Sequence, residues 1–373
     1  MVVCLIMIGG SLCMTTGTAS ATVTKADPLD SWYGVQGDYK AIDCNGVFTS
    51  SLVSSKINYI QAKYKYDKKY PGSGLCYGYA VKINSMFGNS SKKTTLDKKL
   101  TAANIKTYLK GCKPGTHLRL TGGYGTHSIV LFKVTDKMIY WADNNSMPGG
   151  ANLVHYYAQP ISGFYHLGTF KKMSYMEEPK ALKYASKPDV ASMRLQDGYT
   201  HLYWLKTSNT KSYSVYRKAG NGLFACIKSG VTAKNFIDKT AVPGKTYTYK
   251  IKAIKKDGST VSGARCTAKA HLGTPVVKVK NNKDGKIVIS WKKIKGANKY
   301  KIYTYSNTKY EYVLLKTINS GSTTSFIDNT AKDYTTKHQY VVRALGTYDG
   351  KTIYSYYSLD SDYITQDKVE PAE

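Results

Sequence analysis

Short runs in which apolar and polar residues alternate fill the second half of the chain. Two of the clearest are YSVYRK at 213–218 and TYKIKAI at 248–254. Alternation with a period of two is typical of strands that bury one face. Turn-forming groups separate such runs, among them Gly220-Asn221-Gly222, Pro243-Gly244 and Asp257-Gly258. The pattern predicts an antiparallel sandwich of about seven strands.

This pattern occurs twice. Matched segments recur at intervals of 87 to 91 residues: Trp204 with Trp291, YSVYRK at 213 with YKIYTY at 300, FIDKTA at 236 with FIDNTA at 326, and Tyr249 with Tyr340. The interval grows slowly, as small loop insertions between matched strands would cause. Two copies of one β module are therefore predicted, at about 182–270 and 274–366.

The repeated segments resemble fibronectin type III modules. The resemblance rests on the early Trp (Trp204 and Trp291), the YxVYR strand, the FID turn, and Tyr247 at the tyrosine-corner position. In the second copy His338 takes the place of that tyrosine. The resemblance implies two all-β, immunoglobulin-like sandwiches. Such modules serve as spacers or attachment arms or carry a specific binding role, and the sequence leaves both open.

The first half of the chain has a different pattern. Apolar residues at helical spacing predict two helices, the first from Leu52, Val53, Ile57, Ile60 and Tyr64, the second from Leu96, Leu100, Ile105 and Leu109. Strand-like segments follow: HLRL, SIVLFKV and MIYWAD. Helices followed by a small antiparallel sheet predict an α+β domain over residues 22–175, ending near the polar stretch Glu177-Glu178-Pro179-Lys180.

Residues 1–21 carry no charge and include the apolar run VVCLIMIGG, which ends before Ala19-Ser20-Ala21, an A-x-A cleavage signal. A basic segment ahead of the run is missing, so the true translation start is open. The run is too short to span a membrane. We therefore expect a signal peptide at 1–21 and a secreted or wall-associated protein with no transmembrane segment.

Five cysteines remain once a leader is removed: Cys44, Cys76, Cys112, Cys226 and Cys266. An odd number in an exported chain leaves at least one thiol unpaired. No C-x-x-C spacing indicates zinc, and no pair of histidines has metal-ligand spacing. No metal or other cofactor is predicted.

Cys76 is the thiol in the most reactive sequence context. The segment Pro71-Gly72-Ser73-Gly74 resists helix formation, and an amphipathic run begins directly after it. Cys76 is therefore predicted at a helix N-terminus, where the helix dipole and unpaired N–H groups stabilise a thiolate.

His127 opens a predicted strand 51 residues later, and Asp143 ends the next one. A hairpin at 135–137 would make these strands neighbours and place Asp143 beside His127. The chemistry then assigns three roles. Cys76 attacks a carbonyl carbon, His127 holds the thiolate as an ion pair and protonates the leaving amine, and Asp143 fixes the imidazole tautomer. The Cys76 backbone N–H is a candidate oxyanion donor.

These segments resemble secreted bacterial papain-like cysteine peptidase domains with a GxCxGFA-type motif, here Gly74-Leu75-Cys76-Tyr77-Gly78-Tyr79-Ala80. KINYIQAKYKYDKKYPG, KPGTHLRL and DNN resemble further segments of that group over residues 45–165. The resemblance implies Cys76 as nucleophile, His127 as base and Asp143 as orienter, with Asn145 nearby. A Gln often precedes the Cys of this group as an oxyanion donor. Here Leu75 stands there, and Gln61 is the candidate substitute.

Three functions remain open from the sequence. The favoured one is an exported thiol hydrolase of peptide or other amide bonds. The second is a non-catalytic surface- or wall-binding protein with a degenerate peptidase fold, which Leu75 favours. The third is a peptidoglycan amidase or endopeptidase acting on wall peptides. The remaining histidines are interpreted as surface or core residues: His117, His155, His166, His201, His271 and His338.

The net charge of +30 comes from 54 Lys and Arg against 24 Asp and Glu. Residues 22–172 hold 20 against 8, and residues 173–373 hold 34 against 16. The positive charge is spread along the chain and is not gathered in a tail or stripe, which argues against a nucleic-acid partner. We expect the basic β modules to hold the protein at an anionic wall polymer or glycan surface.

Overall fold

The computed structural model describes residues 6–8, 11–13, 42–123, 125–145, 152–164, 166–331 and 334–367. Within the predicted leader, β1 (Ile6–Ile8) pairs antiparallel with β2 (Ser11–Cys13). The rest of the leader, including the Ala19-Ser20-Ala21 signal, lies outside the described residues. The described chain is mostly β-sheet and divides into two compact units, Val35–His271 and Met1–Gly34 with Leu272–Glu373.

The first part of the Val35–His271 unit is built on a six-stranded antiparallel sheet in the order β3-β8-β4-β5-β6-β7. Its strands are β3 (Gly88–Lys99), β4 (Thr116–Thr121), β5 (Thr126–Val134), β6 (Met138–Asn144), β7 (Val154–Pro160) and β8 (Lys172–Leu182). Its helices are α1 (Ser51–Lys63), α2 (Leu75–Phe87), α3 (Ala102–Leu109), η1 (Ile161–Gly163) and α4 (His166–Thr169).

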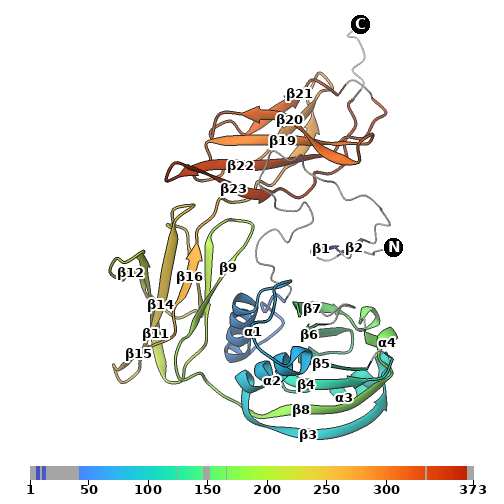
Figure 1. Cartoon of the computed structure of the whole chain (residues 1–373), viewed down its shortest axis with the longest axis vertical. Helices are drawn as coiled ribbons and strands as arrows, with labels where there is room; N and C mark the ends of the chain where they lie inside the picture. The colour runs from blue at the N-terminus through green and yellow to red at the C-terminus, as the bar shows by residue number, and fades with distance from the viewer. Residues whose placement is uncertain are drawn as a thin grey trace. The chain divides into compact units, whose positions relative to one another are not determined.

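The strands of this sheet lie side by side in that order (Figure 1), and two apolar cores lie on its opposite faces. On one face, Ile57 of α1 and Ile83 of α2 pack in a cluster with Val130 and Phe132 of β5. On the other face, Ile105 of α3 packs in a cluster with Ile129 and Leu131 of β5. Alternate residues of β5 therefore bury themselves on both faces, which explains its nearly continuous apolar sequence. The strands predicted from HLRL, SIVLFKV and MIYWAD are confirmed as β4, β5 and β6.

Two expectations about this region need correction. The helix predicted from Leu96 to Leu109 begins only at Ala102, because Leu96 lies in β3 and faces the core from a strand. The polar stretch at 177–180, expected to end the domain, lies within β8. There Glu177 and Glu178 stand opposite Lys93 and Lys92 of β3, so paired charges make a polar strand stable at this position.

The first sandwich occupies the rest of the Val35–His271 unit. One sheet has the order β13-β10-β9, with β9 (Val190–Arg194), β10 (Thr200–Trp204) and β13 (Asn235–Asp238). The other has the order β12-β11-β14-β15, with β16 also on β14: β11 (Thr210–Ala219), β12 (Ala225–Val231), β14 (Thr246–Lys255), β15 (Thr260–Ser262) and β16 (Cys266–Lys269). The Tyr247 hydroxyl accepts from the Val242 N–H at 3.2 Å, as expected of a tyrosine corner.

The second sandwich belongs to the other unit. It pairs a β17-β18-β21 sheet with a β20-β19-β22-β23 sheet. The strands are β17 (Lys278–Asn281), β18 (Ile287–Ser290), β19 (Lys299–Ser306), β20 (Glu311–Ile318), β21 (Ser325–Asp328), β22 (Tyr340–Tyr348) and β23 (Lys351–Tyr357). The matched strands of the two copies thus have the same order, as the repeat predicts. Among the helices of the described residues, none is long and apolar enough to cross a membrane.

Candidate functional site

Cys76 is the second residue of α2, as the sequence predicts, and its side chain is partly exposed. The chain reaches it through two residues of positive φ, Gly74 at 82° and Leu75 at 47°. Cys44, Cys76, Cys112, Cys226 and Cys266 form no disulfide.

Gly78 has a steric role at the start of this helix. A Cβ on Gly78 would lie 1.9 Å from the Ser73 carbonyl oxygen, which leaves no space for any side chain. The Gly78 N–H donates to the Gly74 carbonyl at 2.8 Å, so this contact belongs to the first turn of α2. The glycine is therefore required by the packing of the 71–74 turn against the helix that carries Cys76.

Replacing Gly78 by Ala is expected to destabilise the fold by about 1–3 kcal/mol or more, because the backbone of the turn must move to admit the methyl group. Urea unfolding would measure the loss. Gly163→Ala is the matched control, since a Cβ there meets nothing within 4 Å. Equal stability of the two variants would contradict the steric role of Gly78.

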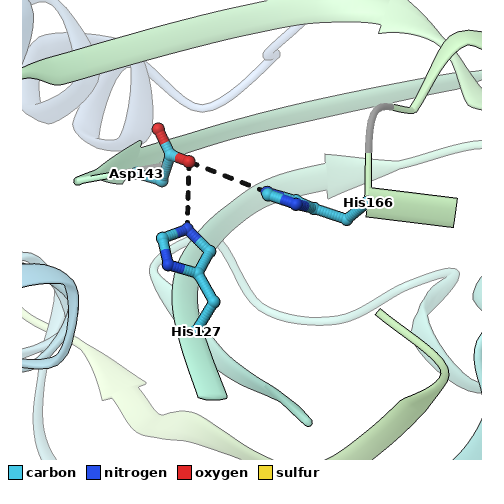
Figure 2. A group of neighbouring side chains, drawn as sticks. All are labelled: His127, Asp143 and His166. Atoms are coloured by element: carbon cyan, nitrogen blue, oxygen red, sulfur yellow. Dashed lines mark hydrogen bonds and ion pairs between the residues drawn. The ribbon is translucent and has the colours of Figure 1, made fainter. Parts of the chain in front are cut away.

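His127 and Asp143 meet across the β5–β6 hairpin. Asp143 stands opposite Ile129 in the register, two residues from His127 on the same strand. The His127 Nε2 lies 3.1 Å from the Asp143 Oδ2, and both side chains are buried. Figure 2 shows the two side chains pointing toward each other. This pairing leaves the Nδ1 of His127 for the thiol.

The Cys76 side chain hydrogen-bonds His127. Burial raises the pKa of the Cys76 thiol, but the hydrogen bond and charge of His127, the Ser128 backbone N–H and the charge of Arg119 outweigh it. The pKa of Cys76 is therefore lower than that of an ordinary thiol. The structure thus brings together Cys76, His127 and Asp143 in the order that a thiolate–imidazolium pair requires.

The pKa of the His127 imidazole shifts in the opposite direction, upward. Burial lowers the pKa of His127, whereas the hydrogen bonds with Asp143 and Cys76 raise it, and the resulting pKa is about 9. Phe170 stacks on the His127 ring with centroids 5.7 Å apart and planes at 15°. The ring is thus held between an apolar face and a carboxylate that stabilises its protonated form.

Asp143 has two further imidazole neighbours that the sequence did not assign to the site. The Nδ1 of His155 lies 3.6 Å from Oδ1. The Nε2 of His166 lies 3.7 Å from Oδ2 (Figure 2). Burial raises the pKa of Asp143, but the hydrogen bond with His127 and the neighbouring His155 and His166 rings hold it well below its usual range. His155 and His166 are buried, as a core reading expects, and both also lie beside the Asp143 carboxylate.

Of these two histidines, only His155 could have been placed near Asp143 from the sequence. His155 on β7 stands directly opposite Asp143 on β6, which a hairpin prediction extended by one strand would have found. His166 lies on the short helix α4, and no local pattern places it beside β6. The donor atoms of His127, Asp143 and His166 lie within 4.8 Å of one another, so this group is the set of described residues best placed to hold a metal ion.

Asn145 does not join the catalytic group in this arrangement. Its φ is 66°, and its Oδ1 accepts from the Asn152 backbone N–H at 3.2 Å. Its own N–H donates to the Leu153 carbonyl at 3.2 Å. Asn145 therefore closes the loop that joins β6 to β7, a turn role that its left-handed conformation suits.

Gln61, the candidate oxyanion donor, is also engaged elsewhere. It is fully buried on α1, where its side-chain amide exchanges two 3.0 Å hydrogen bonds with the backbone of Ile42. This clamp fixes the segment that leads into α1, so the side chain is held as a structural residue.

Replacing Gln61 by Met should lower the free energy of unfolding by about 2–4 kcal/mol, because the Ile42 N–H and carbonyl lose their partners in a buried position. The folded fraction should keep its rate of hydrolysis. An oxyanion donor would behave differently, with a rate loss of about 10²- to 10³-fold and little loss of stability. Chemical denaturation and turnover measured on the same preparation separate the two.

A second polar network lies beside Cys76. The Ser128 hydroxyl accepts from Arg119 at 2.8 Å and hydrogen-bonds the His117 Nε2 at 2.9 Å. The other ring nitrogen of His117 lies 3.2 Å from Glu177 Oε2. This network holds β4, β5 and β8 together at the point where the Ser128 N–H approaches the thiol. Sequence reasoning did not identify it, because its members come from three strands.

Comparison with known proteins found no protein-family model and no curated relative that matches the chain. Solved structures that match are fibronectin type III proteins. A Fn3-like protein from Clostridium thermocellum has 23% identity and a TM-score of 0.18, over 19% of this chain and 75% of that one. A two-domain fibronectin type III segment of chicken tenascin has 16% identity and a TM-score of 0.27, over 48% of this chain and 95% of that one.

Proposed function

We propose that this chain is an exported thiol hydrolase that cleaves peptide or other amide bonds through Cys76, His127 and Asp143. In this proposal the basic β modules hold it at anionic surfaces. The observation that carries the catalytic part is the continuous chain of contacts from the thiol to His127 and from His127 to the buried carboxylate of Asp143. The order of a helix-borne Cys, a strand His and an Asp on the next strand supports a papain-like domain in the first part of the chain.

The reaction follows from these positions. The Cys76 thiolate attacks the carbonyl carbon, and the bond to nitrogen breaks as the His127 imidazolium gives its proton to the leaving amine. The product is a thioester on Cys76. Water then attacks the thioester, gives a proton to His127 and releases the acid, which restores the thiolate–imidazolium pair. Asp143 keeps its hydrogen bond to Nε2 throughout and stabilises each protonated state of the ring.

Active-site labelling tests the proposal. A thiol-directed peptide probe is expected to label the wild type and to leave Cys76→Ala unlabelled. Cys226→Ala is the matched control, since Cys226 is an exposed thiol outside the site. Labelling that persists in Cys76→Ala and disappears in Cys226→Ala would overturn the proposal.

A second candidate is a non-catalytic binding protein that keeps the fold of a hydrolase. Leu75 and the engaged amide of Gln61 favour it, because neither supplies a side-chain oxyanion donor. The fibronectin type III neighbours are compatible with a binding role. This candidate expects no turnover of a fluorescein-labelled unfolded protein and no loss of turbidity from purified cell walls. Turbidity loss without cleavage of the protein would instead favour a peptidoglycan amidase or endopeptidase.

The pKa shifts predict different pH dependences for alkylation and hydrolysis. Iodoacetamide alkylation of Cys76 needs only the thiolate, so its rate should rise through a pKa below that of an ordinary thiol and then stay level. Hydrolysis also needs the proton on His127, so its rate should fall as the pH passes about 9. The rates of alkylation and of hydrolysis, each measured across pH 4–11, would test this. A hydrolysis profile that keeps rising above pH 9 would contradict the ion pair.

A further inference from the structure

The outward face of the larger sheet in the first sandwich carries a group of four cations packed over two aromatic rings. We call it the cationic face. Its members project from β11, from β14 and from the segment just before β16, and two aromatic rings lie beneath them. They are Lys218, Lys250, Lys252 and Arg265.

The contacts are close. The Phe224 ring has Lys250 Nζ at 4.7 Å from its centroid, the Arg265 guanidinium at 5.0 Å and Lys218 Nζ at 5.6 Å. The Tyr216 ring has Lys250 Nζ at 5.2 Å and Lys252 Nζ at 5.6 Å. Lys250 is shared by both rings, so the four cations form one continuous group.

The strand pattern explains why these side chains point outward. Tyr249, Ile251 and Ala253 of β14 are fully buried in the core of the sandwich, so Lys250 and Lys252, which alternate with them, face the other way. Tyr216 of β11 stands directly opposite Lys250 in the register. The cationic face therefore lies on the side of the sheet that the core leaves uncovered.

Few carboxylates of the described residues lie near this charge, and one of them, Asp189, accepts from the Ala264 N–H at 2.7 Å, next to Arg265. From residue 210 to 269 the acidic residues are Asp238 and Asp257. Asp238 is buried and accepts from Arg217 at 2.7 Å, and Asp257 accepts from Ser259 in its own turn. Within the described residues, no member of the cationic face forms an ion pair within 4 Å. Four like charges held this close repel one another, and a bound anion would relieve that repulsion.

The second copy of the module lacks this face. By the repeat intervals, Val341 and Arg343 stand where the first copy has Lys250 and Lys252, and Tyr303 stands for Tyr216. Val341, Tyr303 and Tyr357 belong to a small apolar cluster. Arg343 is buried, and its guanidinium donates a hydrogen bond to the Tyr357 hydroxyl at 3.2 Å. The same sheet is thus stable without an exposed cation group, so the first copy carries it for another reason.

We infer that the cationic face binds a linear polymer of repeating phosphodiester groups that carries no bases, such as a polyol phosphate chain. Cations cover the rings of Tyr216 and Phe224, so these rings are poorly placed to stack on nucleic-acid bases or sugars. The guanidinium of Arg265 can hold an anionic group of either kind, phosphate or carboxylate, through its planar pair of donors, and the regular spacing of charge along a phosphodiester chain would let one chain contact all four cations. The inference specifies the anionic surface in the proposed function and does not depend on Cys76.

Immobilised poly(glycerol phosphate) tests this with the full chain. The variant with Lys218, Lys250, Lys252 and Arg265 all changed to Gln should bind about 10- to 100-fold more weakly than wild type at low salt. The matched control changes Lys278, Lys280, Lys292 and Lys293 of the second copy to Gln. It removes the same charge from exposed positions and should bind within about twofold of wild type. Thermal unfolding of both variants confirms that they fold.

Other outcomes would overturn the inference. Equal weakening by the control variant would show that net charge alone is responsible. Better competition by single-stranded DNA than by poly(glycerol phosphate), at equal phosphate concentration, would identify a nucleic-acid surface. Retention only on phosphatidylglycerol vesicles would identify a membrane surface. Cys76→Ala should bind the polymer as wild type does, so failure of the catalytic proposal leaves this test intact.

Discussion

Replacing His127 by Ala is expected to abolish most of the reactivity of Cys76. The His127 hydrogen bond is the largest of the influences that lower the pKa of the thiol, while burial raises it. Without the imidazole, the two largest influences that lower the pKa are lost, and the pKa of the thiol rises. At pH 6 the thiolate fraction should then fall, and iodoacetamide alkylation should slow in proportion.

Hydrolysis should suffer more than alkylation in the same variant. It loses the thiolate and also the proton donor for the leaving amine, which by itself contributes about 10²- to 10⁴-fold. Turnover of a fluorescein-labelled unfolded protein would measure the combined loss. An alkylation rate at pH 6 close to that of wild type would contradict the ion pair, whatever the substrate is.

A control is needed because His127 is buried against Phe170, and its loss leaves a cavity. His201 offers a matched pair outside the site, since its Nε2 lies 2.8 Å from Asp197 Oδ2 in the first sandwich. His201→Ala should leave both rates unchanged. His127→Gln, which keeps more of the side-chain volume, should be as slow as His127→Ala even where its unfolding midpoint is nearer to wild type.

The sequence was sufficient for features set by local pattern. Residues on β14 alternate strictly between core and surface, so the strand and its buried face could be predicted from the order Tyr249, Lys250, Ile251. Cys76 could be placed because Gly74 and its neighbours prevent an earlier start of α2. The pairing of His127 with Asp143 followed from a short hairpin, in which the register is nearly fixed by the turn.

Features set by distant segments were missed or predicted wrongly. Leu96 and Leu100 have helical spacing, but pairing with β8 makes Leu96 part of β3, and Leu100 lies just beyond the last residue of that strand. His166 reaches Asp143 from α4, more than twenty residues along the chain. Asn145 follows Asp143 by two residues, yet its positive φ turns the chain into the next loop. Tertiary context, which one sequence does not contain, decides each of these cases.

Asp143→Asn is expected to produce the second large effect, through the pKa of His127. The carboxylate is fully buried, and its hydrogen bond is the largest of the influences that raise the pKa of that imidazole to about 9. A neutral amide removes the charge that stabilises the imidazolium. It also permits the wrong tautomer of the ring, because an amide can donate to Nε2 as well as accept from it.

Two readouts follow from this change. The turnover number should fall by about 10²- to 10⁴-fold, the range in which loss of an orienting carboxylate acts. The alkaline limb of the hydrolysis profile should also move from about pH 9 toward the ordinary pKa of histidine, near 6.5. A residue that only supports the fold would lower the yield of active protein without moving that limb.

Asp238→Asn is the matched control for this experiment. Asp238 is also a buried aspartate, and it accepts from Arg217 at 2.7 Å and Tyr249 at 2.8 Å in the first sandwich. Its replacement should lower the unfolding midpoint and leave the pH profile of hydrolysis in place, because it removes a buried carboxylate without touching His127. If Asp143→Asn loses stability like the control but keeps the alkaline limb at about pH 9, then Asp143 is a structural residue. The imidazolium of His127 would then owe its stability to the Cys76 thiolate alone.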